Sequence, residues 1–138
     1  MAEALILDSE AINALARATE RGVLAERARA IVAVACERRS LVRVPSPVLA
    51  EVCRGSRFDA AVNRLLLGRG ISVCNLTRTI AQRAGEILHK NSLSSPHAID
   101  AFVVATALEF DTAVIATGDE GDMKRLAAPY RNLRIFRI

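Results

Sequence analysis

The chain has 138 residues, of which 51% are hydrophobic and only 4% are aromatic. This length predicts one domain over residues 1–138, with a core built mainly from Ala, Val, Leu and Ile. The formal charge of +4 comes almost entirely from arginine. This charge favours a polyanionic partner, because the planar guanidinium group binds phosphate at two points, but a GC-rich genome would leave the same arginine excess.

The sequence also indicates where the protein acts. We find no apolar run that approaches the roughly 18 residues that a membrane helix needs. The N-terminus has no basic region ahead of its first apolar stretch, so a signal peptide is not expected. Cys36, Cys53 and Cys74 lie far apart without a Cys-x-x-Cys pair. We therefore expect a cytoplasmic protein with buried free thiols, no disulfides and no membrane partner.

The first half of the chain begins with Leu5–Asp8, an apolar run ended by a carboxylate, which is typical of a strand buried on both faces of a parallel sheet. An amphipathic helix follows from Ser9, and Gly22 ends that pattern. The remaining segments of this half alternate in the same way: a helix at Val23–Arg39, a strand at Leu41–Val44, and helices at Val48–Arg54 and Phe58–Leu67.

The second half repeats the alternation of strands and helices. The segments are a strand at Ile71–Cys74, a helix from Thr77 to about Asn91, a helix at His97–Phe110, a strand at Ala113–Ala116, a short helix to Ala127 and a strand at Leu133–Ile138. Strands that alternate with helices form βαβ units with right-handed crossovers. The sequence therefore predicts an α/β fold with a central, parallel, five-stranded sheet and helices on both faces.

Five acids stand where the apolar pattern gives little reason for a charge: Asp8, Glu51, Asp100, Asp119 and Asp122. Asp8 and Asp119 follow strands and should lie at one edge of the sheet, where sites of open α/β sheets form. Each acid also has a structural explanation. Asp8 (or its neighbour Ser9) and Asp119 can cap helices, and Asp100 can favour the positive end of its helix. Glu51 can pair with Arg54 on a solvated face.

Carboxylates that converge in a cleft repel one another unless a cation lies between them. Magnesium prefers oxygen ligands and bridges to phosphate, whereas the sequence shows no His or Cys cluster that would favour zinc. A cation held in this way can activate water and offset charge on a phosphate. The acids and the arginines together point to metal-dependent hydrolysis of a phosphodiester.

The ordered set of motifs resembles the PIN-domain ribonucleases, and specifically the VapC toxins of bacterial toxin–antitoxin pairs. The matching stretches are Leu5–Ser9, Leu49–Val52, His97–Ala107 and Ala116–Asp122, which span nearly the whole chain in order. The resemblance implies an endoribonuclease that needs Mg²⁺ or Mn²⁺. It further implies a homodimer and a VapB-like antitoxin that blocks the metal site.

The resemblance also implies roles for single residues. Asp8, Glu51, Asp100 and Asp119 would be catalytic, with Asp8, Asp100, Asp119 and Asp122 as the metal ligands. Thr117 would support the site through its hydroxyl, as would Ser9 to a lesser degree. Arg54 and Arg57 follow Glu51 closely, and we consider them for phosphate contacts with RNA, although both also suit a solvated helix face.

Two other functions fit parts of the pattern. A phosphoacceptor receiver domain has the same fold class and size, but it needs adjacent acids before its first helix and a lysine near its last strand, whereas Lys90 and Lys124 both lie on predicted helices. A catalytically inactive PIN-like binding module is harder to distinguish from an active nuclease by sequence. The only feature that argues against it is that this sequence has an acid at every acidic position of the family pattern.

Overall fold

A computed structural model describes residues 3–68 and 70–138, and these residues form an α/β fold around one five-stranded sheet. The strand order is β3-β2-β1-β4-β5, and every neighbouring pair is parallel. The strands are β1 (Glu3–Leu7), β2 (Leu41–Pro45), β3 (Ile71–Cys74), β4 (Thr112–Thr117) and β5 (Leu133–Arg137). The predicted fold class and all five predicted strands are confirmed.

Strand β1 lies at the centre of the sheet, as its composition requires. Leu5 pairs with Val42 of β2 on one side and with Val114 of β4 on the other. Residues Ala4 to Leu7 are at most 2% exposed, because helices cover both faces of the strand. The carboxyl ends of β1 and β4 are therefore adjacent, which places Asp8 and the segment after Thr117 at the same edge of the sheet.

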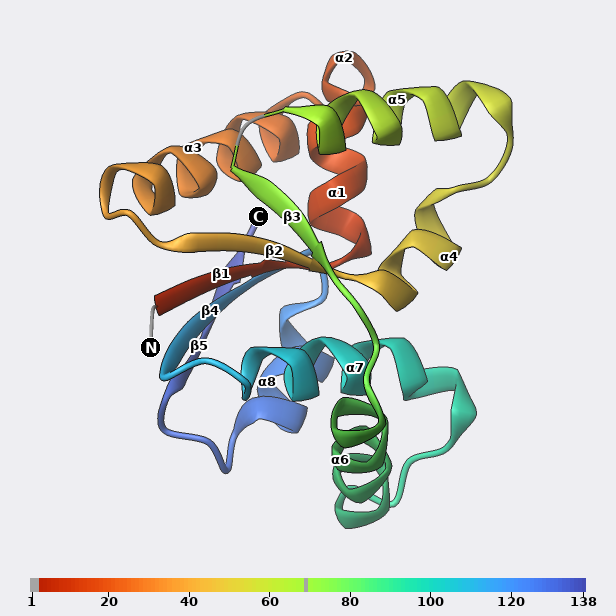
Figure 1. The fold of residues 1–138 in the computed structure, drawn as a ribbon, viewed down its shortest axis with the longest axis vertical. Coiled ribbons are helices and arrows are strands. Elements are labelled where there is room, and N and C mark those ends of the chain that lie inside the picture. Colours follow the sequence, from red (N-terminus) through yellow and green to blue (C-terminus); the bar gives the residue numbers. More distant parts are fainter. Residues whose placement is uncertain (1–2, 69) are drawn as a thin grey trace.

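Helices pack on both faces of the sheet (Figure 1). One face carries α1, α2, α3 and α5, and the other carries α6, α7 and α8. The short helix α4 lies beyond the carboxyl end of β2, with a 3₁₀ turn before it. The bounds are α1 (Ser9–Ala16), α2 (Ala18–Arg21), α3 (Val23–Glu37), α4 (Leu49–Val52), α5 (Ser56–Leu67), α6 (Arg78–Lys90), α7 (Ala98–Ala107) and α8 (Glu120–Ala127), with 3₁₀ turns at η1 (Ser46–Val48) and η2 (Ser95–His97).

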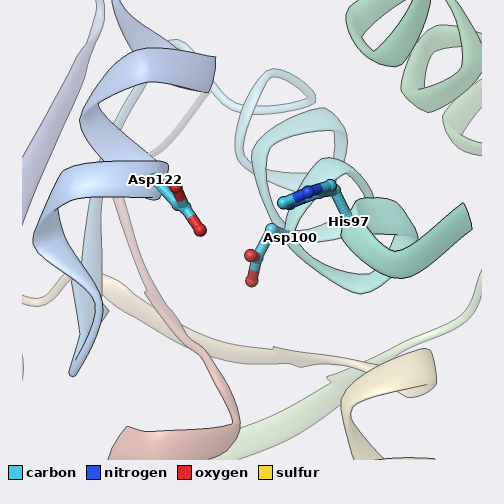
Figure 2. Close-up of side chains that lie close together, drawn as sticks. All are labelled: His97, Asp100 and Asp122. Atoms are coloured by element: carbon cyan, nitrogen blue, oxygen red, sulfur yellow. The ribbon is translucent and has the colours of Figure 1, made fainter. Parts of the chain in front are cut away.

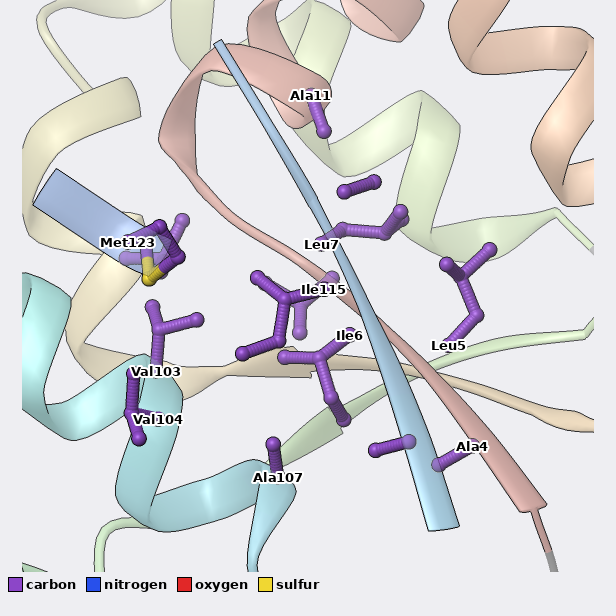
Figure 3. Packing of buried hydrophobic residues seen from close by; sticks show 14 of the residues in the cluster. Ala4, Leu5, Ile6, Leu7, Ala11, Val103, Val104, Ala107, Ile115 and Met123 are labelled. Carbon is purple, nitrogen blue, oxygen red and sulfur yellow. The ribbon is translucent and has the colours of Figure 1, made fainter. Parts of the chain in front are cut away.

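The core is divided by the sheet according to the two-residue period of β1. Figure 3 shows Ile6 and Ile115 on the side of α7, while Leu5 and Leu7 point to the opposite side. Helix α7 is buried over most of its length, including Val103, because β1, β4 and the neighbouring helices surround it. Acids are rare on a helix as apolar as α7, so Asp100 is a candidate for a functional role.

Two predictions about the helices and thiols were wrong. The helix predicted at Val48–Arg54 begins with the 3₁₀ turn η1 and ends at Val52, because the backbone at Cys53 is extended. Cys36 is an exposed thiol rather than a buried one, because Ala35 takes the inward position on α3 and the next residue lies about 100° around the helix. Cys53 and Cys74 are partly buried, and all three are free thiols.

Across residues 3–68 and 70–138, none of the helices has both the length and the apolar character that crossing a bilayer demands.

Candidate functional site

Asp8 leaves the central strand and caps the helix that follows it. One carboxylate oxygen accepts a hydrogen bond of 2.9 Å from the backbone N–H of Ala11, and the Thr117 hydroxyl donates to the same carboxyl group. Asp8 is only 5% exposed. The pKa of Asp8 is raised from 3.8 to about 6, mainly by burial and to a lesser degree by the charges of Asp100 and Glu10, although both hydrogen bonds act in the opposite direction. The cap is therefore a buried carboxyl group whose charged form is costly.

Thr117 connects the ends of the two central strands. It is the last residue of β4 and is fully buried. Its hydroxyl accepts a 2.9 Å hydrogen bond from the backbone N–H of Asp119 and donates to Asp8, which uses both capacities of the group. Thr117 thus fixes the Asp8 carboxylate relative to the loop that carries Asp119.

Asp100 lies in the first turn of α7 and is partly buried. The pKa of Asp100 is raised to about 6, mainly by burial and also by the charges of Glu51, Asp119 and Asp122, while His97 opposes the shift. These acids come from α4, from the cap of α8 and from α8 itself. Electrostatic influence falls off with distance, so these groups lie in one neighbourhood at the carboxyl edge of the sheet. The structure therefore brings the predicted acids close enough to repel.

Three side chains approach one another closely enough to share one cation. A ligand atom from each of His97, Asp100 and Asp122 lies within 4.8 Å of the other two. Figure 2 shows Asp122 pointing from α8 toward Asp100, with His97 beside Asp100 at the start of α7. His97 and Asp100 share a helix face because they are three residues apart. The sequence analysis gave His97 no role, although this spacing was the signal that could have found it.

Asp119 also caps a helix, which is the structural role predicted for it from the sequence. One of its carboxylate oxygens accepts a 3.3 Å hydrogen bond from the backbone N–H of Asp122 and so caps α8. Of the two acids, only Asp122 belongs to the close group with His97 and Asp100. Asp119 still acts on Asp100 through its charge. Asp119 therefore caps a helix and also interacts with Asp100 through its charge, as Asp8 does.

The remaining predicted residues lie around this cluster. Ser9 is the first residue of α1 and is partly buried. The Nε–H of Arg54 donates to the backbone carbonyl of Glu51 at 3.3 Å, and the charge of the exposed Glu51 raises the pKa of Asp100. The exposed Arg57 forms an ion pair of 3.2 Å with Glu20 of α2, and it lines a hollow between α1, α2 and α5.

The donor set fits a divalent cation of intermediate hardness. Carboxylate oxygens from Asp8, Asp100, Asp119, Asp122 and Glu51 are ligands that Mg²⁺ and Mn²⁺ accept. The imidazole of His97 adds a nitrogen donor, which first-row transition ions accept more readily than magnesium does. Two of the acids are partly desolvated carboxylates with raised pKa values, and a cation would relieve that cost.

The sequence matches the family model of the PIN domain over residues 5–129. The chain belongs to the PIN domain family. This match spans the strands and helices that carry every acid described above, and it rules out the receiver-type alternative. A search of curated protein sequences finds no match.

Solved structures share the PIN fold at low sequence identity. The crystal structure of VapBC2 from Rickettsia felis, bound to a DNA fragment from their promoter, is 13% identical with a TM-score of 0.67, and the alignment covers 98% of each chain. VapBC-1 from nontypeable Haemophilus influenzae is 16% identical with a TM-score of 0.65 and 97% of each chain covered. The PIN domain endonuclease Utp24 is 15% identical with a TM-score of 0.60, covering 98% of this chain and 84% of that one.

Proposed function

We propose that this PIN domain is an endoribonuclease that depends on a divalent metal and acts as the toxin of a toxin–antitoxin pair. The observation that carries the proposal is the approach of Asp122 and His97 to the partly buried Asp100, whose pKa is also raised by the charges of Glu51, Asp119 and Asp122. Family membership supports a nuclease, and likeness to two VapBC structures supports the toxin class. RNA as the substrate, Mg²⁺ or Mn²⁺ as the cofactor and the cytoplasm as the location belong to the same proposal.

In this proposal Asp8, Asp100, Asp119 and Asp122 hold Mg²⁺ or Mn²⁺, and Glu51 completes the catalytic group. When bound, the cation would lower the pKa of water and offset charge on the scissile phosphate. Thr117 and the Ala11 N–H hold Asp8 in one orientation, and the charge of Asp100 acts on its carboxyl group. His97 faces Asp100 and adds a nitrogen donor to the carboxylates.

The arginines close to Glu51 supply positive charge beside these acids. Arg54 is held against the backbone of α4, and the side chain of Arg57 is 83% exposed. Both are therefore in a position to contact phosphates of an RNA strand, and Arg57 must leave Glu20 to do so. Phosphate contacts of this kind give affinity without sequence preference.

Activity is the first test. Purified protein should cleave structured RNA in Mg²⁺ or Mn²⁺ and lose cleavage in a chelator. Asp8→Asn and Asp100→Asn should each remove most of the activity, because each removes a charged oxygen ligand from the cluster. Glu86→Gln changes an exposed acid on α6 and serves as the matched control. Circular dichroism should be unchanged in all three variants.

Two results would contradict the mechanism. Cleavage that persists in the chelator would exclude the metal. Full activity of Asp100→Asn would show that the acid on which the other charges act is not needed for cleavage. A protein that binds RNA without cleaving it under any metal would instead be the inactive PIN-like binding module.

The partners of the chain are a further part of the proposal. Val23 and Val34 of α3 and Leu67 of α5 are 67%, 45% and 88% exposed, which is apolar surface that another chain could cover. We expect a homodimer at micromolar concentration by light scattering. We also expect toxicity on expression that a small protein encoded immediately upstream, a VapB-like antitoxin, relieves. A strict monomer that is harmless when expressed alone would contradict both expectations.

A further inference from the structure

A polar hollow opens directly beside the acidic cluster. It has a volume of about 490 Å³ and is lined by Gly118, Asp119, Glu120, Gly121, Lys124 and Arg137. Asp119 belongs both to this hollow and to the group of acids that acts on Asp100. Gly121 has no side chain, and a Cβ atom there would meet only a carboxylate oxygen of Asp119 at 3.9 Å, so the backbone at Gly121 is open to an incoming group. The hollow is therefore a continuation of the candidate site toward α8 and the end of β5.

Three cations, Lys124, Arg137 and Arg27, lie near the two carboxylates of this hollow, Asp119 and Glu120. Lys124 pairs with Glu120 one turn away on α8. Arg27 of α3 donates a 2.7 Å hydrogen bond to the backbone carbonyl of Arg137, and its guanidinium carbon lies 5.9 Å from the centre of the Phe136 ring. The hydrogen bond from Lys124 and the charges of Lys124, Arg137 and Arg27 hold the pKa of Glu120 below its usual value. Positive charge therefore exceeds negative charge here.

The charges at this hollow differ from those in the neighbouring cluster. Only acids and His97 act on Asp100, whereas Lys124 and Arg137 line the hollow together with Asp119 and Glu120. An RNA strand presents phosphates at regular intervals, so one phosphate at the acids places the next within reach of an adjacent cationic hollow. Arg and Lys are the side chains that bind such phosphates.

We propose that the hollow lined by Lys124 and Arg137 binds a backbone phosphate of the RNA strand next to the phosphate that is cleaved. The inference rests on the proposed ribonuclease function and names a binding site for the same substrate. Glu120 competes with that phosphate for Lys124, so it limits the affinity of the hollow. Removal of a cation should therefore weaken RNA binding, and neutralisation of Glu120 should strengthen it.

The test measures binding of a labelled RNA by fluorescence anisotropy in a chelator, where cleavage does not interfere. Lys124→Ala and Arg137→Ala should each raise the Kd several-fold and lower the salt slope of log Kd by about 1, the share of one phosphate contact. Glu120→Gln should lower the Kd several-fold. Both cation variants should fold, because both side chains are exposed and Arg27 binds the backbone of Arg137, not its side chain.

The chain offers a matched control for each cation. Lys90 is its only other lysine, and like Lys124 it lies in the last turn of a helix. Arg134 lies on the same strand as Arg137 but lines a different hollow, at the amino end of the sheet. Lys90→Ala and Arg134→Ala should bind RNA as the unmodified protein does. Melting temperatures confirm that all the variants are folded.

Cleavage in Mg²⁺ is measured in parallel, so the two proposals can fail separately. If the unmodified protein cleaves RNA while Lys124→Ala and Arg137→Ala bind like their controls, the hollow is not a phosphate site and the ribonuclease stands. Weaker binding by Glu120→Gln would also overturn the inference. If the cation variants weaken binding but the unmodified protein never cleaves, the hollow stands and the ribonuclease fails. A protein that binds no RNA overturns both.

Discussion

The stability of the fold favours a neutral Asp8 carboxyl group, whereas the proposed metal site needs a charged one. Burial favours its neutral form, since the pKa rises from 3.8 to about 6, whereas a metal ligand must be charged. In the metal-free protein the unfolded chain loses this proton at lower pH than the folded chain does. The stability that the neutral carboxyl group contributes is therefore fully present below pH 3.8 and is lost as the pH rises through about 6. At pH 7 the loss is on the order of 3 kcal/mol.

Asp8→Asn should therefore change the stability of the metal-free protein in a pH-dependent way. Between pH 4 and pH 7, the free energy of unfolding of the variant should rise relative to the unmodified protein by up to about 3 kcal/mol. Urea unfolding in a chelator at the two pH values measures the difference. Glu86→Gln is the control, and an equal effect of Asp8→Asn at both pH values would contradict the argument.

At the scale of elements, the loop between β4 and α8 sets the distance between Asp8 and Asp119. A Cβ atom on Gly118 would lie 2.8 Å from both Cβ and Cγ of Glu10 in the first turn of α1. The Glu10 Cβ is fixed to the helix backbone, so it cannot move aside as a side-chain end could. Only glycine allows the loop to approach α1 this closely.

Gly118→Ala should therefore push the loop away from α1 and separate the acids of the two strands. We expect a loss of about 1–3 kcal/mol of stability, as for other overpacked sites, together with a fall in nuclease activity. Gly85→Ala on α6 is the matched control, because its added Cβ would meet no atom within 4 Å. Alanine also suits the helix α6 better than glycine does. Thermal melts and cleavage rates of both variants test this, and a Gly118→Ala protein as stable and active as Gly85→Ala would contradict it.

The elements also show how much of the fold and of the candidate site could be predicted from the sequence alone. All five strands could be predicted, because each is a short apolar run with polar or turn residues beside it, and a buried parallel strand needs little else. That Asp8 and Asp119 share one edge followed from the parallel sheet. The approach of His97 to Asp122 could not be predicted, because it depends on how α7 and α8 pack against each other on one face of the sheet. Likewise, the face of α3 that carries Cys36 is decided by packing against α1 and the sheet, not by local pattern.

At the scale of the whole molecule, the fold separates charge of opposite sign. The chain carries a net charge of +4, yet Asp8, Glu51, Asp100, Asp119 and Asp122 gather at the carboxyl edge of the sheet, with Lys124 and Arg137 lining the hollow beside them. Such an arrangement suits a polyanion whose approach is favoured by the surface and whose reacting group meets a metal at the centre. It also means that the metal-free fold contains repulsion that one cation can remove.

Metal binding should therefore stabilise the whole fold. At a free metal concentration of 100 times the dissociation constant the gain is about 2.7 kcal/mol, which should raise the melting temperature of a domain of this length by roughly 6 to 14 °C. Asp100→Asn should cancel most of this gain. Without metal, the same variant should be as stable as the unmodified protein or slightly more so, because one charge that Glu51, Asp119 and Asp122 repel is gone.

The alternative explanation of Asp100, as an acid placed only to favour the start of α7, predicts the reverse. Magnesium would have no effect, and neutralisation of Asp100 would cost up to about 1 kcal/mol through the helix dipole. Thermal melts of both proteins, in Mg²⁺ and in chelator at matched ionic strength, separate the two explanations. Measurements at pH 7 are decisive, because below about pH 6 the carboxyl groups of Asp8 and Asp100 take up protons that compete with the cation. If the unmodified protein melts at the same temperature in both buffers at pH 7, the acids at this edge do not form a metal site.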